Sequence, residues 1–182
     1  MTHTDKHYHA VQFYKDDESL AATVGRFLGA GLKAGQPGVV IATPPHSKLI
    51  LAQLELKGLN PAGLQRTGEL VTLDAKKVLS SFMIGKLPDP LMFKSNVGDA
   101  IDRLCAVRMP GPIRAYGEMV DLLWQDGNSE GAIKLEMLWN QLASSYDFEL
   151  LCGYAFGSFY KETRDMRLDL EAVISQHTEV VI

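Results

Sequence analysis

The order of the apolar segments along this chain constrains its fold more than any other feature. Five short runs rich in β-branched or aromatic residues are separated by longer segments with apolar residues at helical spacing. The five runs are Ala10–Tyr14, Gly38–Thr43, Leu70–Asp74, Ile113–Gly117 and Phe148–Cys152. Strands that alternate with helices are joined by right-handed crossovers and form a mostly parallel sheet. The sequence therefore predicts an α/β fold of three layers, in which a sheet of five or more strands carries helices on both faces.

Residues that favour helix starts precede most of the helical segments. Asp17 or Ser19 is suited to cap the first long helix, and Ser47 and Ser129 are suited to cap two others. The last segment, from Ser158 to His177, has an apolar stripe on a highly charged helix. We expect this helix to end the fold.

The length of 182 residues and the 46% share of hydrophobic residues fit a single globular domain with its own core. We find no repeat, no low-complexity segment and no linker. The opening residues are polar and lack apolar periodicity. The sequence therefore predicts a flexible tail over residues 1–6 and one domain over residues 7–182.

The charge balance favours neither nucleic acid nor a membrane surface as a partner. Eighteen basic side chains stand against 22 acidic ones, for a formal net charge of −4. The first ten residues lack the apolar segment of a secretory leader, and no run reaches the roughly 20 apolar residues of a membrane span. We expect a cytoplasmic protein. Cys105 and Cys152 both lie in apolar runs, which predicts two buried, reduced thiols.

The segment after the first strand argues against nucleotide hydrolysis. A phosphate loop needs glycines, a lysine and a hydroxyl at that place, but Lys15–Ser19 has no glycine and contains three consecutive acids. Two like charges about 4 Å apart repel by roughly 4 kcal/mol near a protein surface. The glycines of Gly29–Gly35 follow a helix instead of opening one, which indicates close helix packing and a helix end.

The sequence has no recognisable catalytic or metal-binding motif. We find no HExxH pair, CxxC pair or GxSxG elbow, and no spacing that ties serine, histidine and acid into a triad. His3, His7 and His9 could gather a metal ion, but an uncoupled polar tail is the simpler interpretation. We therefore predict a protein that is not an enzyme and has no metal and no cofactor.

Polar and aromatic residues occur at or just beyond the ends of the predicted strands, and they define a candidate ligand site. Ligands of open parallel sheets bind beyond the carboxyl ends of the strands. The candidate ligand-binding residues are His9, Gln12, Tyr14, Thr43, Asp74, Glu118, Trp124, Asn128, Trp139 and Asn140. His9 and Gln12 are equally suited to satisfying buried backbone groups.

Four of the other candidates also have structural interpretations. Glu118 is either a partly desolvated ligand-binding acid or the first-turn acid of the next helix. Asp74 is suited to cap a helix, and Asn128 to form a turn beside Gly127. Trp139 lies on a helical apolar stripe, which predicts a place in the core.

Six ordered motifs resemble those of one family, the MEDS domain, a sensory module of methanogens and methylotrophs. They are His9–Tyr14, Leu70–Ala75, Arg114–Val120, Leu123–Asn128, Glu136–Asn140 and Leu151–Tyr154. The ending Ile174–Val181 also resembles the C-terminal signature of that family. The similarity covers about residues 7 to 181.

The resemblance implies a KaiC- and RecA-like fold without a working phosphate loop, and a ligand that is a small organic or hydrocarbon-derived compound. Members are usually joined to histidine-kinase or DNA-binding output domains, whereas this chain ends at Ile182. A stand-alone sensor and a module of a longer regulator both fit that ending.

Three hypotheses for function follow. The leading one is a sensory domain that binds a small molecule and regulates a two-component or transcriptional output. In it the ligand biases the last helix, which engages a protein partner or a second copy, without direct contact to nucleic acid. The alternatives are a RecA- or KaiC-like nucleotide-binding enzyme with an unconventional phosphate site, and a scaffold that dimerises through the charged last helix.

Overall fold

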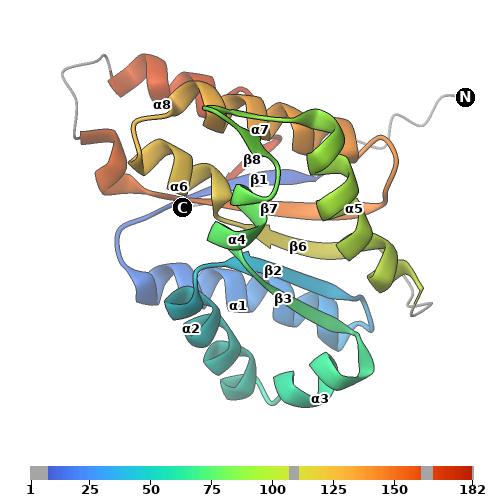
Figure 1. Cartoon of the computed structure of the whole chain (residues 1–182). Helices are drawn as coiled ribbons and strands as arrows, with labels where there is room; N and C mark the ends of the chain where they lie inside the picture. Colours follow the sequence, from blue (N-terminus) through green and yellow to red (C-terminus); the bar gives the residue numbers. More distant parts are fainter. Residues whose placement is uncertain (1–7, 107–110, 161–165, 182) are drawn as a thin grey trace, which may run out of the picture.

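Six parallel strands form the central sheet of the computed structural model, which describes residues 8–106, 111–160 and 166–181. The strand order is β3-β2-β6-β7-β1-β8 (Figure 1). The strands are β1 (His9–Tyr14), β2 (Gly38–Ala42), β3 (Leu70–Asp74), β6 (Ile113–Gly117), β7 (Phe148–Ala155) and β8 (Glu179–Val181). The predicted α/β class and all five predicted strands are confirmed.

The sixth strand, β8, was not predicted. The last helix, α8 (Met166–Ile174), ends before His177, and a 3-10 turn, η1 (Phe156–Tyr160), occupies the start of the expected helix. Residues 161–165 of that expected helix lie outside the described residues. Beyond α8, the Thr178 amide donates to the His9 carbonyl at 2.6 Å and the Thr178 hydroxyl accepts from the His9 amide at 2.9 Å. These bonds place β8 beside β1, where its β-branched residues suit an extended conformation.

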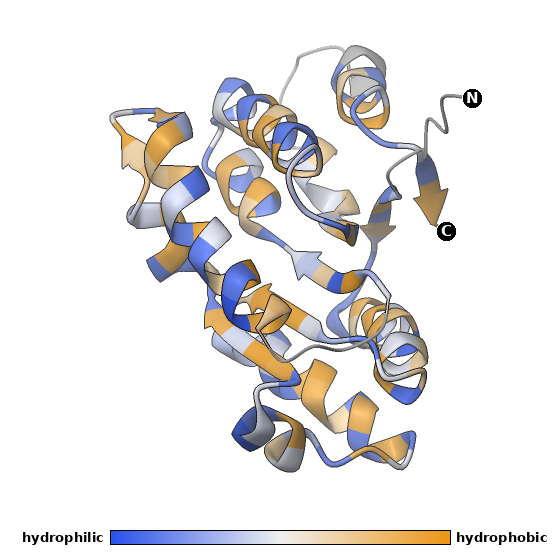
Figure 2. Cartoon of the chain, turned by 90° about the vertical axis from the view of Figure 1, so that its right-hand side faces the viewer, coloured by the Kyte–Doolittle hydropathy of each residue, from blue (hydrophilic) through white to orange (hydrophobic). Residues whose placement is uncertain are grey.

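Three helices cover the first face of the sheet, and they follow β1 and β2 in the chain. They are α1 (Asp17–Lys33), α2 (Pro44–Leu56) and α3 (Pro61–Thr67). Leu20, Val24 and Leu28 repeat at helical spacing on α1 and are fully buried against this face. Figure 2 shows that the helices carry hydrophilic and hydrophobic residues in alternating bands, as one-sided burial requires.

The second face carries the remaining helices and a small hairpin. The helices are α4 (Ala75–Ser80), α5 (Pro90–Cys105), α6 (Met119–Gln125), α7 (Ser129–Leu142) and α8, and the hairpin pairs β4 (Met83–Ile84) with β5 (Leu87–Pro88). Trp139 of α7 is 1% exposed and packs edge-on against Phe93 and Phe148. Its predicted place in the core is confirmed. Among the described residues, no helix combines the length and the apolar character that crossing a bilayer requires.

The residues that cap the helices lie one to four positions before the predicted ones. Asp16 caps α1 by accepting from the Ser19 amide at 2.7 Å, and Asn128 caps α7 by accepting from the Gly131 amide at 3.0 Å. Helix α2 begins at Pro44, earlier than expected, because proline is favoured in the first turn, where no amide hydrogen is needed. Each shift moves the helix start towards its preceding strand.

Cys105 is exposed, contrary to the prediction of two buried thiols, whereas Cys152 is buried. Cys105 is the last residue of α5. Ile101 and Leu104 are the side chains that this end of the helix buries. Cys105 directly follows the buried Leu104 in the sequence, and the prediction wrongly counted it among the buried residues of the helix.

Gly153, in the centre of the sheet, allows a tyrosine from the next strand to cross it. A Cβ atom at this position would lie 2.7 Å from Tyr116 Oη and 3.3 Å from Leu20 Cδ1.

We predict that Gly153→Ala lowers the free energy of unfolding by about 1–3 kcal/mol, because overpacking displaces the buried tyrosine. Urea denaturation measures this change. Gly157→Ala is the matched control, since a Cβ there meets nothing within 4 Å, and it should stay within about 0.5 kcal/mol of the parent. Equal effects of the two substitutions would contradict the packing argument.

Candidate functional site

A switch point in the sheet lies between neighbouring strands β2 and β6. β2 continues into α2 on the first face, whereas β6 continues into α6 on the second face. Chains that part in this way leave polar groups at the carboxyl ends of the strands, which is where α/β proteins bind ligands. The amide of Glu118, directly after β6, donates to the Ile41 carbonyl of β2 at 3.1 Å and so ties the two strand ends together.

Glu118 occupies this switch point as a buried carboxylate, 2% exposed. Its Oε1 accepts from the Thr43 amide at 2.5 Å, and its Oε2 lies 2.6 Å from His46 Nδ1 and accepts from the Tyr116 hydroxyl at 3.1 Å. The other ring nitrogen of His46 lies 3.2 Å from Asp17. Glu118 directly precedes α6, and its two oxygens bridge the end of β2, the start of α2 and β6. Its role in ligand binding stays a prediction.

The His46 imidazole is held in its charged form by this arrangement. Its hydrogen bond to Glu118 is the largest influence and raises the pKa of His46 from 6.5 to about 9, against the opposing effect of burial and with additional help from Asp17. At neutral pH the switch point therefore contains an imidazolium between two carboxylates. The positive charge of His46 compensates the buried negative charge of Glu118, which would otherwise be strongly destabilising.

A second buried acid, Asp121, continues the network along α6. Its Oδ2 accepts from the Tyr14 hydroxyl at 2.9 Å and from the Gln125 amide at 2.7 Å, and its Oδ1 accepts from Ser158 at 3.3 Å. Burial raises the pKa of Asp121, although these hydrogen bonds act in the opposite direction. Burial and the adjacent Asp121 also raise the pKa of the Tyr14 hydroxyl, which therefore stays protonated and donates.

The connection from β1 to α1 leaves little room for phosphates. Only Lys15 and Asp16 separate the strand from the helix. The Asp16 carboxylate accepts from the Ser19 amide, so it already occupies part of the positive helix end, and Asp17 and Glu18 follow in the first turn. The acids that the sequence places here lie where a nucleotide-binding fold would present free amides.

A third polar cluster lies between the second face of the sheet and helices α7 and α8. Glu136 of α7 is fully buried, and its carboxylate lies 3.2 Å from His9 and 3.3 Å from His177. It accepts from the Tyr154 hydroxyl at 2.8 Å and from the Cys152 thiol at 3.5 Å. Burial alone would raise the pKa of Glu136, but the attraction of His177 and His9 outweighs it and lowers that pKa well below the ordinary value. Burial likewise opposes a charge on His177, but Glu136 outweighs it and raises the pKa of His177.

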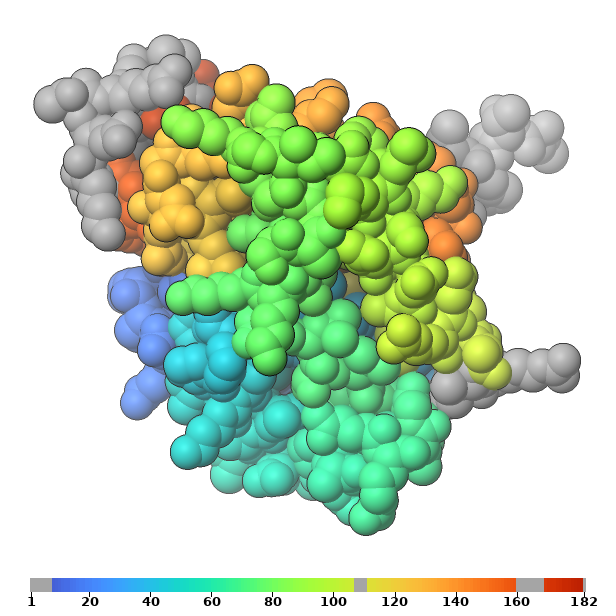
Figure 3. All heavy atoms as spheres, in the orientation of Figure 1, coloured from blue at the N-terminus to red at the C-terminus, as the bar shows by residue number. Residues whose placement is uncertain are grey.

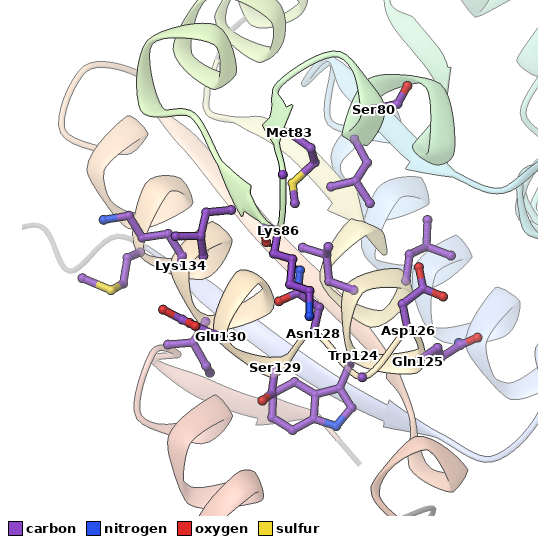
Figure 4. Close-up of a pocket in the computed structure, with 18 of the residues that line it drawn as sticks. Ser80, Met83, Lys86, Trp124, Gln125, Asp126, Asn128, Ser129, Glu130 and Lys134 are labelled. Atoms are coloured by element: carbon purple, nitrogen blue, oxygen red, sulfur yellow. The ribbon is translucent and has the colours of Figure 1, made fainter.

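A surface groove of about 1440 Å³ lies over the second face, between the β4–β5 hairpin, α4, α6, α7 and α8. Figure 4 shows Lys86 of the hairpin above Asn128, with Trp124 and Ser129 below it and Asp126 and Gln125 at one side. The Asn128 amide donates to the Lys86 carbonyl at 2.6 Å and so joins the hairpin to α7. In Figure 3 the segment from α4 through the hairpin runs as a raised green band beside α6. The apolar lining residues are Leu79, Met83, Leu87, Leu122, Leu123, Trp124, Ile133, Met137 and Ala172.

The ten predicted ligand-binding residues are therefore divided among several places. Tyr14, Thr43 and Glu118 meet at the carboxyl edge of the sheet, where the ring of His46 packs edge-on against Tyr14. Trp124 and Asn128 line the groove. The remaining five residues lie elsewhere.

Two of those five, His9 and Asn140, share a hydrogen bond of 2.8 Å in the cluster around Glu136. Asp74 caps α4, as its structural interpretation predicted, and Trp139 is core. Gln12 donates to the Ser19 carbonyl at 3.4 Å, while its Oε1 is buried without a hydrogen-bond partner in the described chain.

Sequence reasoning missed His46 and Asp121, and it did not connect Glu136 with His177. His46 follows two prolines and its importance depends on a carboxylate 72 positions away. Both His46 and Asp121 are polar residues in the first turn of the helix that follows a buried strand, and this position could have pointed to them. For Glu136, the signal was an acid on the inward stripe of an amphipathic helix.

Small-molecule sites are typically concave and mostly apolar with a few placed polar groups, and the groove on the second face has this character. The MEDS family, whose full description is methanogen/methylotroph, DcmR sensory domain, matches residues 8–173. The chain belongs to this family, and its role is therefore sensory. No curated protein matches the chain at a significant level.

The His46–Glu118 pair should make stability depend on pH. Because folding raises the pKa of His46 from 6.5 to about 9, the stabilisation is complete below pH 6.5 and is lost as the pH rises through about 9. A difference of this size corresponds to at most about 3 kcal/mol, before solvent screening of the half-buried ring. We predict that His46→Gln lowers the free energy of unfolding at pH 6 and has little effect at pH 10.

Urea denaturation across this range measures the effect, and the proton resonances of the His46 ring report its titration directly. Lys48→Gln on the same helix is the matched control, because Lys48 is exposed, and it should retain the pH dependence of the parent. A constant difference between parent and His46→Gln at all pH values would contradict the charged pair.

Proposed function

We propose that this MEDS domain binds a small, mostly apolar organic molecule in the groove, and that binding regulates a two-component or transcriptional output through the C-terminal segment. The observation that carries the proposal is that one groove is lined by residues of both α6 and α8. Helix α6 begins at the buried Glu118 network, and α8 leads to the C-terminal strand. A ligand there would contact both α8 and Gln125, which donates a hydrogen bond to Asp121 of the polar network.

The lining of the groove suits a hydrocarbon-derived compound with one polar group. Leucine, isoleucine, methionine and tryptophan side chains form much of it. Lys76, Lys86 and Lys134 supply positive charge at the rim, and Asp126 and Glu130 supply negative charge. An apolar surface with a few placed polar groups provides both affinity and orientation for a small ligand.

Gln125 offers a route from the groove to the carboxyl edge of the sheet. It lines the groove and donates to Oδ2 of Asp121. The same oxygen accepts from the Tyr14 hydroxyl, and this bond holds β1 against α6. A ligand that repositions Gln125 changes its hydrogen bond to Asp121. Such a change transmits a signal only if the ligand binds two arrangements of the domain with different affinities.

The C-terminal segment is the element that this mechanism moves. Asp169 and Ala172 of α8 line the groove, while Ile174 and Val180 are exposed at 40% and 37%. A shift of α8 alters what these apolar side chains present to a protein partner or to a second copy of the chain. Neither a nucleic acid nor a membrane is needed in this scheme.

The proposed domain is not catalytic. The sensory family supports this, as do the short connection after β1 and the carboxylates at the start of α1. A nucleotide-binding enzyme with an unconventional phosphate site predicts the opposite behaviour towards ATP and Mg²⁺. We expect calorimetric titration to show no saturable binding in the micromolar range, and saturable binding would favour the enzyme.

Filling the groove should abolish ligand binding. We predict that Ala172→Trp removes the thermal stabilisation that the parent domain gains from compounds selected in a screen of alcohols, carboxylic acids and halogenated alkanes. Ile174→Trp on the same helix is the matched control, because Ile174 does not line the groove, and it should bind as the parent does. Compounds that bind Ala172→Trp as tightly as the parent would exclude the groove as the site.

A further inference from the structure

Four potential metal ligands from four separate parts of the chain meet in the interior, away from the groove. They are His9 at the start of β1, Glu136 on α7, Cys152 on β7 and His177 after α8. One ligand atom from each lies within 4.8 Å of the others. The side chains of His9, Glu136 and His177 are fully buried, and Cys152 is 0% exposed.

Three of the separations are close to those between ligands on the corners of a tetrahedral site, and all ligand atoms lie within 4.8 Å of one another. Bonds of about 2.0–2.3 Å to nitrogen, oxygen and sulfur place neighbouring ligand atoms roughly 3.3–3.8 Å apart. His9 Nε2 lies 3.4 Å from Cys152 Sγ and 3.2 Å from Glu136 Oε2, and that oxygen lies 3.5 Å from Cys152 Sγ. His177 Nε2 lies 3.3 Å from Glu136 Oε1.

Both imidazoles are oriented by acceptors on their outer nitrogens. His177 Nδ1 lies 2.8 Å from the Val173 carbonyl, which can only accept, so Nδ1 carries the hydrogen. Asn140 donates through Nδ2 to the Gln176 carbonyl, which leaves its Oδ1 to accept from His9 Nδ1 at 2.8 Å. In neutral rings, both Nε2 lone pairs therefore face the cluster. Metal-binding histidines are typically oriented in this way.

A buried lone pair that faces a carboxylate is repelled by it unless a proton or a metal ion lies between them. His177 Nε2 is buried and forms no aligned hydrogen bond, although it lies close to Glu136 Oε1. A proton on His177 would leave this N–H poorly directed. A central metal ion would use the same lone pair together with the neighbouring thiol and carboxylate.

We propose that His9, Glu136, Cys152 and His177 bind a divalent zinc-type cation. Two imidazoles, a thiolate and a carboxylate suit Zn²⁺ and exclude hard cations such as Mg²⁺ and Ca²⁺. On binding, the S–H bond of Cys152 breaks, a metal–sulfur bond forms and the proton passes to solvent. The thiolate and the Glu136 carboxylate then neutralise the two positive charges of the ion.

The proposed site differs from the sequence-based prediction of a domain without metal, and it does not depend on the proposed groove. Its consequence is mechanical. His177 belongs to the C-terminal segment, whereas the other three ligands belong to β1, α7 and β7. A bound ion therefore fastens the end of α8 and the start of β8 to the core, next to the Asn140–Gln176 bond.

The test uses the full chain, without an affinity tag, unfolded with a chelator and refolded with Co²⁺ or Zn²⁺. We expect one tightly bound ion per chain by elemental analysis. Co²⁺ should give intense visible bands of tetrahedral geometry and a thiolate-to-cobalt charge-transfer band. Asn140→Ala should weaken binding about 10–100-fold, because it removes the acceptor that orients His9.

Matched variants identify the ligands without relying on a variant that fails to fold. Cys105→Ser leaves Cys152 as the only thiol and should keep the charge-transfer band, while Cys152→Ser should lose it. A His3→Ala/His7→Ala variant should bind as the parent does, which separates the buried cluster from the N-terminal histidines.

Three outcomes would overturn the proposal. The first is a folded protein, verified by circular dichroism, that binds less than one ion per chain at micromolar metal. The second is loss of the thiolate band in Cys105→Ser, and the third is loss of binding in the His3→Ala/His7→Ala variant. In the first case Glu136 is balanced by a protonated histidine instead.

Discussion

The polar network at the carboxyl edge of the sheet depends on one buried carboxylate, that of Glu118. It lies where the neighbouring strands β2 and β6 lead the chain to opposite faces of the sheet. Glu118 accepts from the Thr43 amide at the end of β2, from Tyr116 on β6 and from His46 at the start of α2. Removing one partner would leave a buried charge uncompensated, at a cost of several kcal/mol. The helices α2 and α6 consequently begin at positions set by the same side chain, which relates the two faces of the sheet to each other.

The second face of the sheet carries the features that connect ligand binding with the C-terminal segment. The groove reaches from α6 to α8, and the cluster around Glu136 lies where the chain returns from α8 to β8. The two features use different side chains of the same segment: Ala172 and Asp169 contact the groove, and His177 enters the cluster. A ligand in the groove and a cation in the cluster would therefore both contact the C-terminal segment, the first through α8 and the second through His177 beyond it.

The local pattern of apolar and polar residues predicted most of the strands and helices, but it did not predict which side chains meet in the candidate site. Apolar runs such as Gly38–Ala42 and helical stripes such as that of α1 were readable, because burial imposes a period on each element separately. Strand β8 was missed because only three residues pair with β1, through bonds that involve His9. Glu118 and Tyr14 were correctly placed near the carboxyl edge. Their partners His46 and Asp121 were not, since no local signal relates residues 72 or 107 positions apart.

The α/β class, the five principal strands, the acidic start of α1 and membership of the MEDS family could be read from the residues alone, because periodicity, caps and ordered motifs are local properties. The folded arrangement was needed to show that the ten candidate residues divide between an edge network, an open groove, a buried cluster and the core. It also decided that Cys152 is buried beside two imidazoles, while Cys105 is exposed. Strand order and the side of each crossover determine which distant side chains share a buried space, and the charge balance within that space determines their chemistry.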